Sequence, residues 1–309
     1  MNDLRIIFMG TPEFAVPSLE ILIEHKYNIL AVITAPDKPQ GRGQKIAYSP
    51  VKQSAVKHNI PVLQPTNLKS PEFLTALKNY QANLQIVVAF RMLPEVVWSM
   101  PALGTFNLHA SLLPQYRGAA PINWAIINGE KETGVTTFFL QHEIDTGSII
   151  FQEKETILED DNAGALYDRL MNKGAGLVLK TVKAIEQGSY PSMPQTESKE
   201  IKHAPKIFKE TCEIQWNNTS DNVKNFIRGL SPYPGAWTVI EGKVFKIFTV
   251  SAVASGTHPF EPGQVFRTDN KTYLHARTFD GWVAIEDLQP EGKKKMTVQE
   301  FFRGNKLVL

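Results

Sequence analysis

Apolar runs, some continuous and some alternating with polar residues, recur along the first half of the chain. They fall at residues 4–9, 28–35, 84–89, 105–109 and 133–141. The continuous runs are typical of strands buried on both faces, as in a parallel sheet. A strand, a turn, a helix and a second strand follow one another at the start, which is how a doubly wound sheet begins. The pattern therefore predicts an α/β fold with a Rossmann-like, doubly wound, mostly parallel sheet.

The segments between these runs predict helices. They lie at about residues 12–26, 50–59, 71–80, 119–128 and 162–187. Thr11 is placed to cap the first helix, with Pro12 at its first position and Pro17 shortening or kinking its start. Asn162 is the expected cap of the last and longest helix.

The character of the chain changes after residue 188. Residues 189–208 are rich in Pro, Ser and charge, which is typical of a linker. One helix at 220–230, capped by Ser220, is then predicted among short runs typical of β structure. These runs are 213–216, 236–240, 243–250, 263–267, 271–276 and 281–285. They suit a small β-barrel of the OB type. We therefore expect one domain at 1–188, a linker at 189–208 and a C-terminal domain at 209–309.

Composition and charge narrow the class of protein. The net charge of +2 is too small to indicate a nucleic-acid partner by itself. Residues 200–309 carry 15 basic and 12 acidic side chains, against 18 and 19 in residues 1–199. The single cysteine, Cys212, excludes an intrachain disulfide, and no signal peptide or membrane-length run is present, so we expect a cytoplasmic protein. The scattered histidines lack the paired spacing of a metal site.

Two polar residues stand at the end of the fourth apolar run. Asn107 and His109 are two apart and share one face of a strand, while Leu108 points the other way into packing. Ligands of open α/β sheets bind outside the carboxyl ends of the strands, where an amide and an imidazole can stabilise an oxyanion and move a proton. The alternative is a turn residue and a satisfied histidine. Asp145 is likewise either an Asx-turn residue or a carboxylate that orients His109.

Two further segments indicate contacts with anions. Gly10, Thr11 and Pro12 follow the first run. Only one of the three glycines of a dinucleotide fingerprint is present there, which disfavours a nucleotide cofactor, but amides at a helix start can bind an anion. Residues 36–49 form a basic, Gly- and Pro-rich loop that we expect to be mobile. It is either a solvated loop or a flap that closes over a polyanion through Lys38, Arg42 and Lys45.

Several of these residues together resemble the signature of a known family. The chain reads Asn107-x-His109-x-Ser111-Leu112-Leu113-Pro114, then Arg117-Gly118, then Asp145-Thr146-Gly147. This pattern resembles the folate-dependent formyltransferases, and the similarity runs almost end to end. The resemblance implies that Asn107, His109 and Asp145 form the catalytic trio. It also implies a tetrahydrofolate site made by Ser111, Leu112, Leu113 and Pro114, with Phe90, Arg91, Met92 and Leu93 beside the pterin.

The resemblance implies transfer of the formyl group of 10-formyltetrahydrofolate to the α-amine of methionine on initiator tRNA, by a monomer without a metal. The basic loop and the second domain favour this acceptor over a small amine such as glycinamide ribonucleotide or a sugar amine. A non-enzymatic RNA-binding or folate-binding protein is the third hypothesis, which His109 and Asp145 disfavour. Residues 89–93 are one residue shorter than the usual form, which bears on side-chain contacts to the pterin.

Basic side chains in the C-terminal part are the expected contacts to tRNA phosphates. Lys293-Lys294-Lys295 is the densest run of charge; the alternative for such a triplet is a solvated turn. It would be joined by Arg228, Arg303 and Lys306. The full set of expected tRNA contacts is Gly10, Thr11, Pro12, Lys38, Arg42, Lys45, Lys206, Lys293, Lys294 and Lys295.

Overall fold

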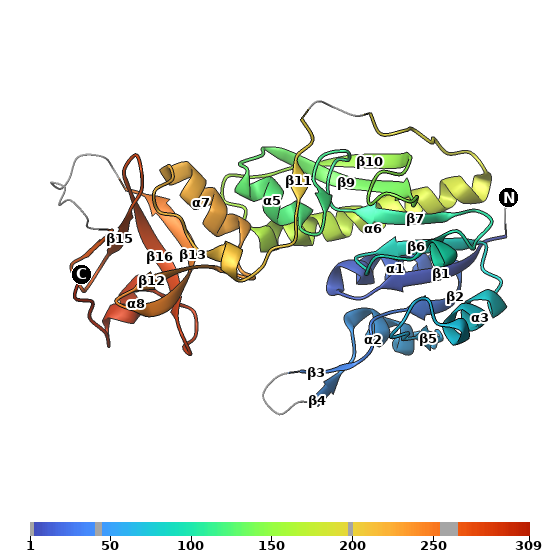
Figure 1. Cartoon of the computed structure of the whole chain (residues 1–309), viewed down its shortest axis with the longest axis horizontal. Coiled ribbons are helices and arrows are strands. Elements are labelled where there is room, and N and C mark those ends of the chain that lie inside the picture. Colours follow the sequence, from blue (N-terminus) through green and yellow to red (C-terminus); the bar gives the residue numbers. More distant parts are fainter. Residues whose placement is uncertain (1–2, 41–44, 197–199, 254–264) are drawn as a thin grey trace. The chain divides into compact units, whose positions relative to one another are not determined.

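The computed structural model describes residues 3–40, 45–196, 200–253 and 265–309, which form two compact units (Figure 1). The first unit consists of Met1–Gly118, Glu132–Thr156 and Tyr167–His203. The second consists of Ala119–Lys131, Ile157–Leu166 and Ala204–Leu309. Two short excursions of the first half of the chain therefore belong to the C-terminal unit, a feature that a division at residues 188 and 208 does not contain.

A seven-stranded sheet forms the core of the first unit. Its strands lie in the order β10 (Ile149–Thr156), β9 (Glu132–Phe139), β7 (Thr105–His109), β6 (Leu84–Val88), β1 (Arg5–Gly10), β2 (Asn28–Ile33) and β5 (Val62–Leu63). The five strands from β7 to β5 are parallel, whereas β9 and β10 are each antiparallel to their neighbours. The predicted Rossmann-like, mostly parallel sheet is confirmed.

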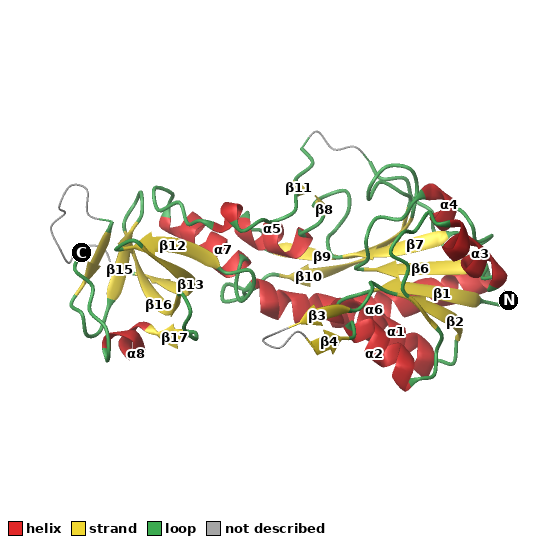
Figure 2. Cartoon of the chain, turned by 60° about the horizontal axis from the view of Figure 1, so that its bottom comes forward, coloured by secondary structure: helices red, strands yellow, loops and turns green. Residues whose placement is uncertain are grey.

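Helices cover both faces of this sheet (Figure 2). Ile7 and Met9 of β1 pack in one cluster with residues of α3 (Pro71–Asn79) and α4 (Glu95–Trp98). The opposite face is covered by α1 (Val16–Glu24), α2 (Pro50–Lys57) and α6 (Ala163–Gln187). Residues 6–9 of β1 are all fully buried. Burial on both faces explains why this strand is continuously apolar.

Helix caps follow the sequence at one end of this unit and not at the other. Asn162 Oδ1 accepts a hydrogen bond of 2.9 Å from the amide three residues on, which confirms the predicted cap of α6. The prediction for Thr11 was wrong. A 3-10 turn, η1 (Glu13–Ala15), precedes α1 with Pro12 at its cap position. Thr11 Oγ1 instead accepts from the Ala35 amide at 3.3 Å, so it joins the ends of β1 and β2.

The basic segment predicted as a loop contains a two-stranded hairpin. β3 (Lys38–Gln40) pairs antiparallel with β4 (Lys45–Ala47). At the base of the hairpin, Lys52 Nζ donates to Asp37 Oδ2 at 2.5 Å and to Gln64 Oε1 at 2.8 Å. The prediction missed these strands because backbone pairing and a long-range ion pair, rather than apolar burial, hold them together.

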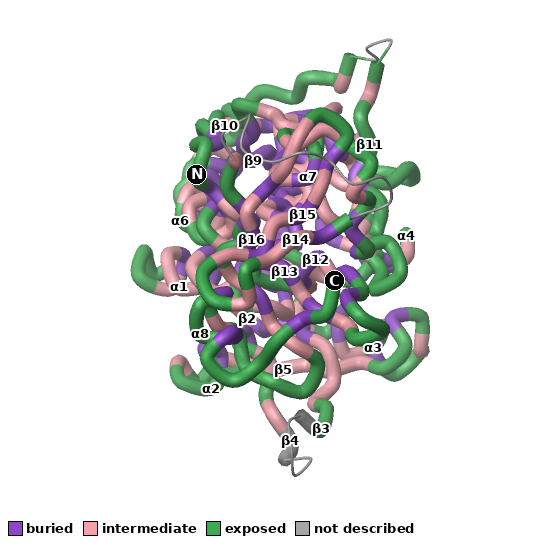
Figure 3. Tube along the Cα trace, turned by 90° about the vertical axis from the view of Figure 1, so that its left-hand side faces the viewer, coloured by how far each residue is buried: buried purple, intermediate pink, exposed green. Residues whose placement is uncertain are grey.

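The second unit is an antiparallel half-barrel. Its strand order is β12 (Ala236–Ile240), β13 (Lys243–Ala252), β16 (Trp282–Pro290), β15 (Leu274–Arg277) and β14 (Phe266–Thr268), with β17 (Met296–Thr297) paired to β16. Helices α7 (Ser220–Gly229) and α8 (Val298–Phe302) share its core. Buried residues alternate with partly exposed ones at the start of β16, as one-sided packing requires (Figure 3). The predicted C-terminal β domain is confirmed.

Two local predictions for this unit were wrong. Residues 213–216 do not form a strand, because a 3-10 turn, η2 (Glu210–Cys212), precedes them and only Glu213 makes an isolated bridge. The cap of α7 is Thr219, whose side chain accepts from the Asn222 amide at 3.3 Å. Ser220 is bonded instead through its amide and hydroxyl to Asp280.

Candidate active site

The carboxyl end of β7 presents the two polar residues predicted there. Leu108 packs toward α6, since a Cβ on Gly174 of that helix would lie 2.7 Å from Leu108 Cδ2. Alternation along the strand therefore turns Asn107 and His109 to the opposite face. Asn107 is half-buried and His109 is 6% exposed. The strand thus delivers an amide and an imidazole to one face of the sheet edge where ligands bind in this class of fold.

The structure brings His109 and Asp145 together from distant parts of the sequence. His109 Nδ1 lies 3.8 Å from Asp145 Oδ2, with the side chains 7% and 13% exposed. Asp145 lies in the connection between β9 and β10 and has a φ of 56°, in the left-handed region. The separation is that of an ion pair and exceeds a hydrogen bond, so the two groups face each other across a small gap.

Backbone groups of one loop orient both members of this pair. His109 Nε2 donates to the Tyr116 carbonyl oxygen at 2.8 Å; a carbonyl only accepts, so Nε2 carries a proton. Asp145 Oδ2 accepts from the Gly118 amide at 3.0 Å, in β8 (Arg117–Gly118). Nδ1 then faces a carboxylate, and a doubly protonated ring gives each acceptor a donor. The arrangement is suited to holding an imidazolium beside a carboxylate.

The loop after β7 is fixed by buried hydrogen bonds. Ser111 Oγ donates to the carbonyl four residues later at 2.6 Å. Thr136 Oγ1 of β9 donates to the Ser111 carbonyl at 2.6 Å and accepts from the Leu113 amide at 3.2 Å. Ser111 and Leu113 are buried, so these two predicted folate residues shape the loop. Leu112 and Pro114 keep partly exposed side chains.

The segment after β6 places its four predicted pterin residues differently. Leu93 is buried in the cluster under α3 and α4, and Phe90 packs against that cluster. Arg91 turns its guanidinium to the carbonyls of Pro65 and Thr66. Met92 alone of the four points fully outward, with 75% of its surface exposed.

Two adjacent loops expose apolar side chains next to this segment. His142 Nε2 lies 3.0 Å from Glu95 Oε2, which places the loop after β9 beside α4. On these loops Met92, Ile144 and Val96 are 75%, 62% and 47% exposed. Exposed apolar side chains gathered on neighbouring loops mark a place where an apolar ligand surface can be covered. The chemistry of these side chains therefore fits a flat, partly apolar ligand.

The basic residues predicted to meet phosphates lie at the surface in both units. In the first unit Lys38 is exposed on β3. Arg42 lies outside the described residues, and Lys45 begins β4 with its side chain outside the description. Gly10 ends β1, and a Cβ there would lie 2.7 Å from Ala15 Cβ, so the start of η1 is tightly packed.

In the second unit Lys206, Lys293 and Lys294 are exposed. The Lys295 ammonium lies 3.1 Å from Asp287 Oδ2, so this member of the triplet already has a counter-charge. Arg228 is turned inward. Its Nη1 donates to the Leu158 and Asp161 carbonyls at 3.2 and 2.9 Å, and burial lowers its pKa. This arginine ties α7 to the residues before α6 within the same unit.

Gln195 is a site residue that sequence reasoning missed. It lies in the segment predicted as a linker, and its Nε2 donates to the Asp145 and Gly147 carbonyls at 2.8 and 2.9 Å. Its Oε1 accepts from Arg117 Nε and Nη2 at 3.1 and 2.6 Å. The partners are two carbonyls and a distant arginine, and nothing in the spacing of residues 189–208 signals them.

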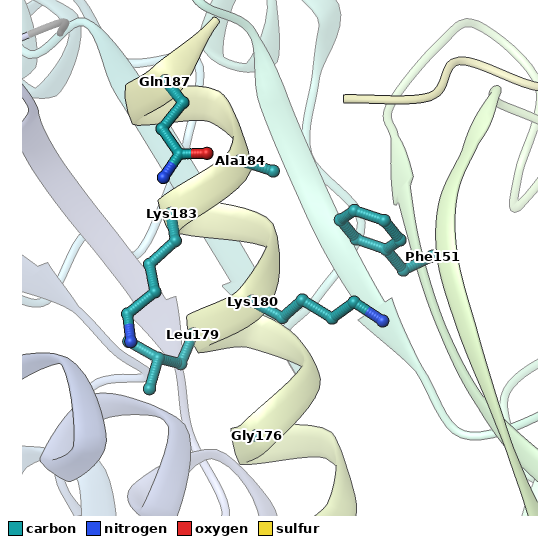
Figure 4. Close-up of a pocket in the computed structure, with 7 residues that line it drawn as sticks. All are labelled: Phe151, Gly176, Leu179, Lys180, Lys183, Ala184 and Gln187. Atoms are coloured by element: carbon teal, nitrogen blue, oxygen red, sulfur yellow. The ribbon is translucent and has the colours of Figure 1, made fainter. Parts of the chain in front are cut away.

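A surface hollow lies elsewhere in the first unit, between β10 and α6, and none of the predicted site residues lines it (Figure 4). Its lining residues are Phe151, Gly176, Leu179, Lys180, Lys183, Ala184 and Gln187. Within the described ranges, no three or more His, Cys, Asp or Glu side chains gather as a metal site would need. No helix of the same ranges has the length and apolar character to cross a bilayer.

Comparison with known proteins identifies relatives over nearly the whole chain. Residues 4–182 match the family model for formyl transferase, and residues 206–306 match that for the formyl transferase C-terminal domain. A methionyl-tRNA formyltransferase of Bacteroides fragilis is 56% identical over 98% of this chain and 95% of its own length. That of Flavobacterium johnsoniae is 52% identical over 98% and 97%.

Solved structures show the same fold at lower identity. An N-formyltransferase from Helicobacter canadensis, solved in complex with folinic acid and dTDP-3-aminofucose, aligns with a TM-score of 0.68 at 23% identity. The alignment covers 95% of this chain and 100% of that one.

Proposed function

Because this chain belongs to the formyl transferase family, and within it to the methionyl-tRNA formyltransferases, we propose that it transfers the formyl group of 10-formyltetrahydrofolate to the α-amine of methionyl-initiator tRNA. The product is formylmethionyl-tRNA, used to start translation. The structural observation that carries the proposal is the facing pair of His109 and Asp145 at the end of β7. A cytoplasmic monomer is the form in which we propose it acts.

The residues of the trio have separate tasks in this reaction. The folate cosubstrate supplies the formyl carbon, and negative charge gathers on the formyl oxygen as the amine attacks. Asn107 and His109 share a face of β7 and are the donors to that oxygen. Since His109 Nε2 is committed to the Tyr116 carbonyl, Nδ1 is the ring atom left to face the reacting groups. Preorganised donors of this kind are worth about 10²–10³-fold in rate each.

Asp145 holds the charge and receives the proton. Its carboxylate beside Nδ1 favours the cationic ring, and the Gly118 amide keeps one carboxylate oxygen in place. As the new C–N bond forms, the amine must lose a proton, and Asp145 accepts it directly or through a water. The 3.8 Å gap leaves room for that transfer, which a closed hydrogen bond would not.

The exposed apolar side chains beside α4 are the proposed wall of the folate site. Met92, Ile144 and Val96 would cover one face of the pterin, while backbone groups of residues 90–93 bind its edge. Leu112 and Pro114 complete the site from the loop after β7. Phe90, Leu93, Ser111 and Leu113 act by fixing the backbone of these loops. The folinic acid in the Helicobacter canadensis enzyme supports a folate at this fold.

The proposed tRNA contacts are exposed basic groups and the start of η1. Lys38 with its hairpin, and Lys206 with Lys293 and Lys294, carry positive charge at the surface of their own units. Gly10, Thr11 and Pro12 are proposed to meet the acceptor end. Transfer to a small amine, as in sugar formyltransferases of the same fold, remains the alternative, and it would leave the basic C-terminal unit without a role.

One assay separates these acceptors. Purified protein is incubated with 10-formyltetrahydrofolate and, in parallel, methionine-charged initiator tRNA, methionine-charged elongator tRNA, glycinamide ribonucleotide and a nucleotide-linked amino sugar. Formylated product is measured by mass spectrometry. We expect formylation of the initiator tRNA far above all other acceptors. Preferential formylation of either small amine would overturn the proposal.

The lysine triplet gives a graded test of the tRNA surface. We expect the K293A/K294A variant to raise KM for tRNA several-fold and to lower the salt dependence of tRNA binding by roughly one to two released ions, because each phosphate contact releases counterions. K295A should have a smaller effect, since Lys295 is paired with Asp287. Unchanged KM and salt slope in the double variant would remove these lysines from the tRNA site.

A further inference from the structure

The segment after α6 crosses the candidate active site. Residues 187–196 are exposed except for Gln195, which is half-buried. Met193 pairs its amide and carbonyl with Ile149 at the start of β10, at 3.0 and 2.8 Å. This pairing brings the segment alongside the connection that carries Asp145. A side chain that turns inward from an otherwise exposed segment has a specific target.

That target is the backbone of the Asp145 loop. The Gln195 carboxamide offers two N–H donors and an oxygen with two lone pairs, and all four are used. The donors go to the carbonyls of Asp145 and Gly147, at 2.8 and 2.9 Å. The oxygen accepts from two nitrogens of Arg117, at 3.1 and 2.6 Å. One side chain thus joins the Asp145 loop to β8.

The two halves of the pair depend on this link. Asp145 has a left-handed φ of 56°, a conformation that costs free energy and persists only where surrounding contacts hold it. Its carboxylate also depends on the amide of Gly118, which directly follows Arg117. Gln195 therefore fixes the Asp145 backbone on one side and the residue next to Gly118 on the other.

We propose that Gln195 is a positioning residue for the formyl transfer, which holds the Asp145 carboxylate in register with His109. It does not touch the reacting atoms. The inference rests on the proposed function, because its readout is the transfer reaction. Without the two donors, the Asp145 loop is free to leave its left-handed conformation, and the carboxylate moves away from Nδ1. Misplacement of a catalytic group by about 1 Å costs roughly 10²-fold in rate.

Two substitutions separate the two halves of the link. Q195L removes all four hydrogen bonds at similar volume. Q195E keeps an acceptor for Arg117 but loses both donors to the carbonyls of Asp145 and Gly147. We expect both variants to lower kcat by about 10- to 10²-fold, with KM for tRNA and for the folate changed less than about threefold. Q187L is the matched control, because Gln187 is exposed at the end of α6, and it should keep wild-type kcat.

A double-variant cycle shows whether Gln195 acts through Asp145. Single-turnover rates are compared for wild type, Q195L, D145N and D145N/Q195L, with melting temperatures measured in parallel. If Gln195 positions Asp145, Q195L costs nothing further in the D145N background. Equal, additive losses in both backgrounds would overturn the inference, as would wild-type kcat in Q195E or a lowered melting temperature with unchanged kcat. Failure of wild type and Q187L to formylate tRNA would instead overturn the proposed function.

Discussion

Two histidine–carboxylate pairs in the first unit differ in geometry. His58 Nε2 lies 2.8 Å from Glu20 Oε2, and Ser54 Oγ donates to the other carboxylate oxygen at 2.7 Å. His109 Nδ1 lies 3.8 Å from Asp145 Oδ2 and each partner is oriented by a backbone group. The first pair is a closed hydrogen bond that joins α1 to α2. The second is held open, so its proton can move.

The burial of the two pairs reinforces this contrast. The side chains of His58 and Glu20 are 27% and 25% exposed, against 7% and 13% for His109 and Asp145. A pair that water reaches contributes modestly to stability. A pair shielded from water and kept slightly apart retains stronger electrostatic interactions for a reacting group that enters. The comparison predicts that breaking one pair affects activity and breaking the other affects stability.

The largest expected effect comes from breaking the open pair. D145N and H109A should each lower the rate of formyl transfer by at least about 10³-fold. An Asn side-chain oxygen can still accept from the Gly118 amide, so the loop should keep its shape. We therefore expect the melting temperature of D145N to stay within about 2 °C of wild type, because no buried contact is lost. Full activity of D145N would contradict the assigned role of the carboxylate.

The next effect comes from disturbing the loop that carries Asp145. A Cβ on Gly147 would lie 1.6 Å from the Phe139 carbonyl oxygen, so G147A must displace the backbone two residues from Asp145. We expect a loss of about 10²-fold in kcat and of about 1–3 kcal/mol in the free energy of unfolding. G176A is the control: Gly176 lies in α6 with nothing within 4 Å of a Cβ, and alanine there should stabilise slightly. Wild-type kcat in G147A would show that the loop tolerates displacement.

These variants also mark what the sequence could reveal. The buried strands were predictable because β1 and β6 are apolar at every position, as burial on both faces demands. The carboxylate was predictable only through the resemblance of Asp145-Thr146-Gly147 to a family signature. Its distance from His109 depends on the antiparallel turn of β9 beside β7, which no local pattern specifies.

Other parts of the site had no sequence signal. The partners of His109 and Asp145 include a Tyr116 carbonyl and a Gly118 amide, and any residue type supplies such groups. Gln195 lies among prolines and serines whose composition is typical of a linker, yet Met193 nearby pairs with β10. Backbone contacts of an irregular segment are long-range products of the fold, and composition cannot predict them.

Breaking the closed pair should have a smaller effect and on a different property. H58A removes the 2.8 Å hydrogen bond to Glu20, and we expect a loss of about 0.5–1 kcal/mol in the free energy of unfolding, with kcat unchanged. Urea denaturation at pH 7 measures the loss, and the formylation assay measures kcat on the same preparation. A tenfold drop in kcat in H58A would show that the two pairs are coupled.

The smallest effect is the pH dependence of that closed pair. Burial raises the pKa of Glu20, but hydrogen bonds from Ser54 and His58 outweigh it, so the pKa lies below its ordinary value. A lowered pKa stabilises the fold above the unfolded value of about 4.3 and loses that contribution as pH falls through the folded value. The difference in free energy of unfolding between wild type and E20Q, below about 1 kcal/mol, should be constant above pH of about 5.5 and shrink in more acidic buffer. A difference that stays constant down to a pH of about 3 would mean that packing, rather than charge, holds α1 against α2.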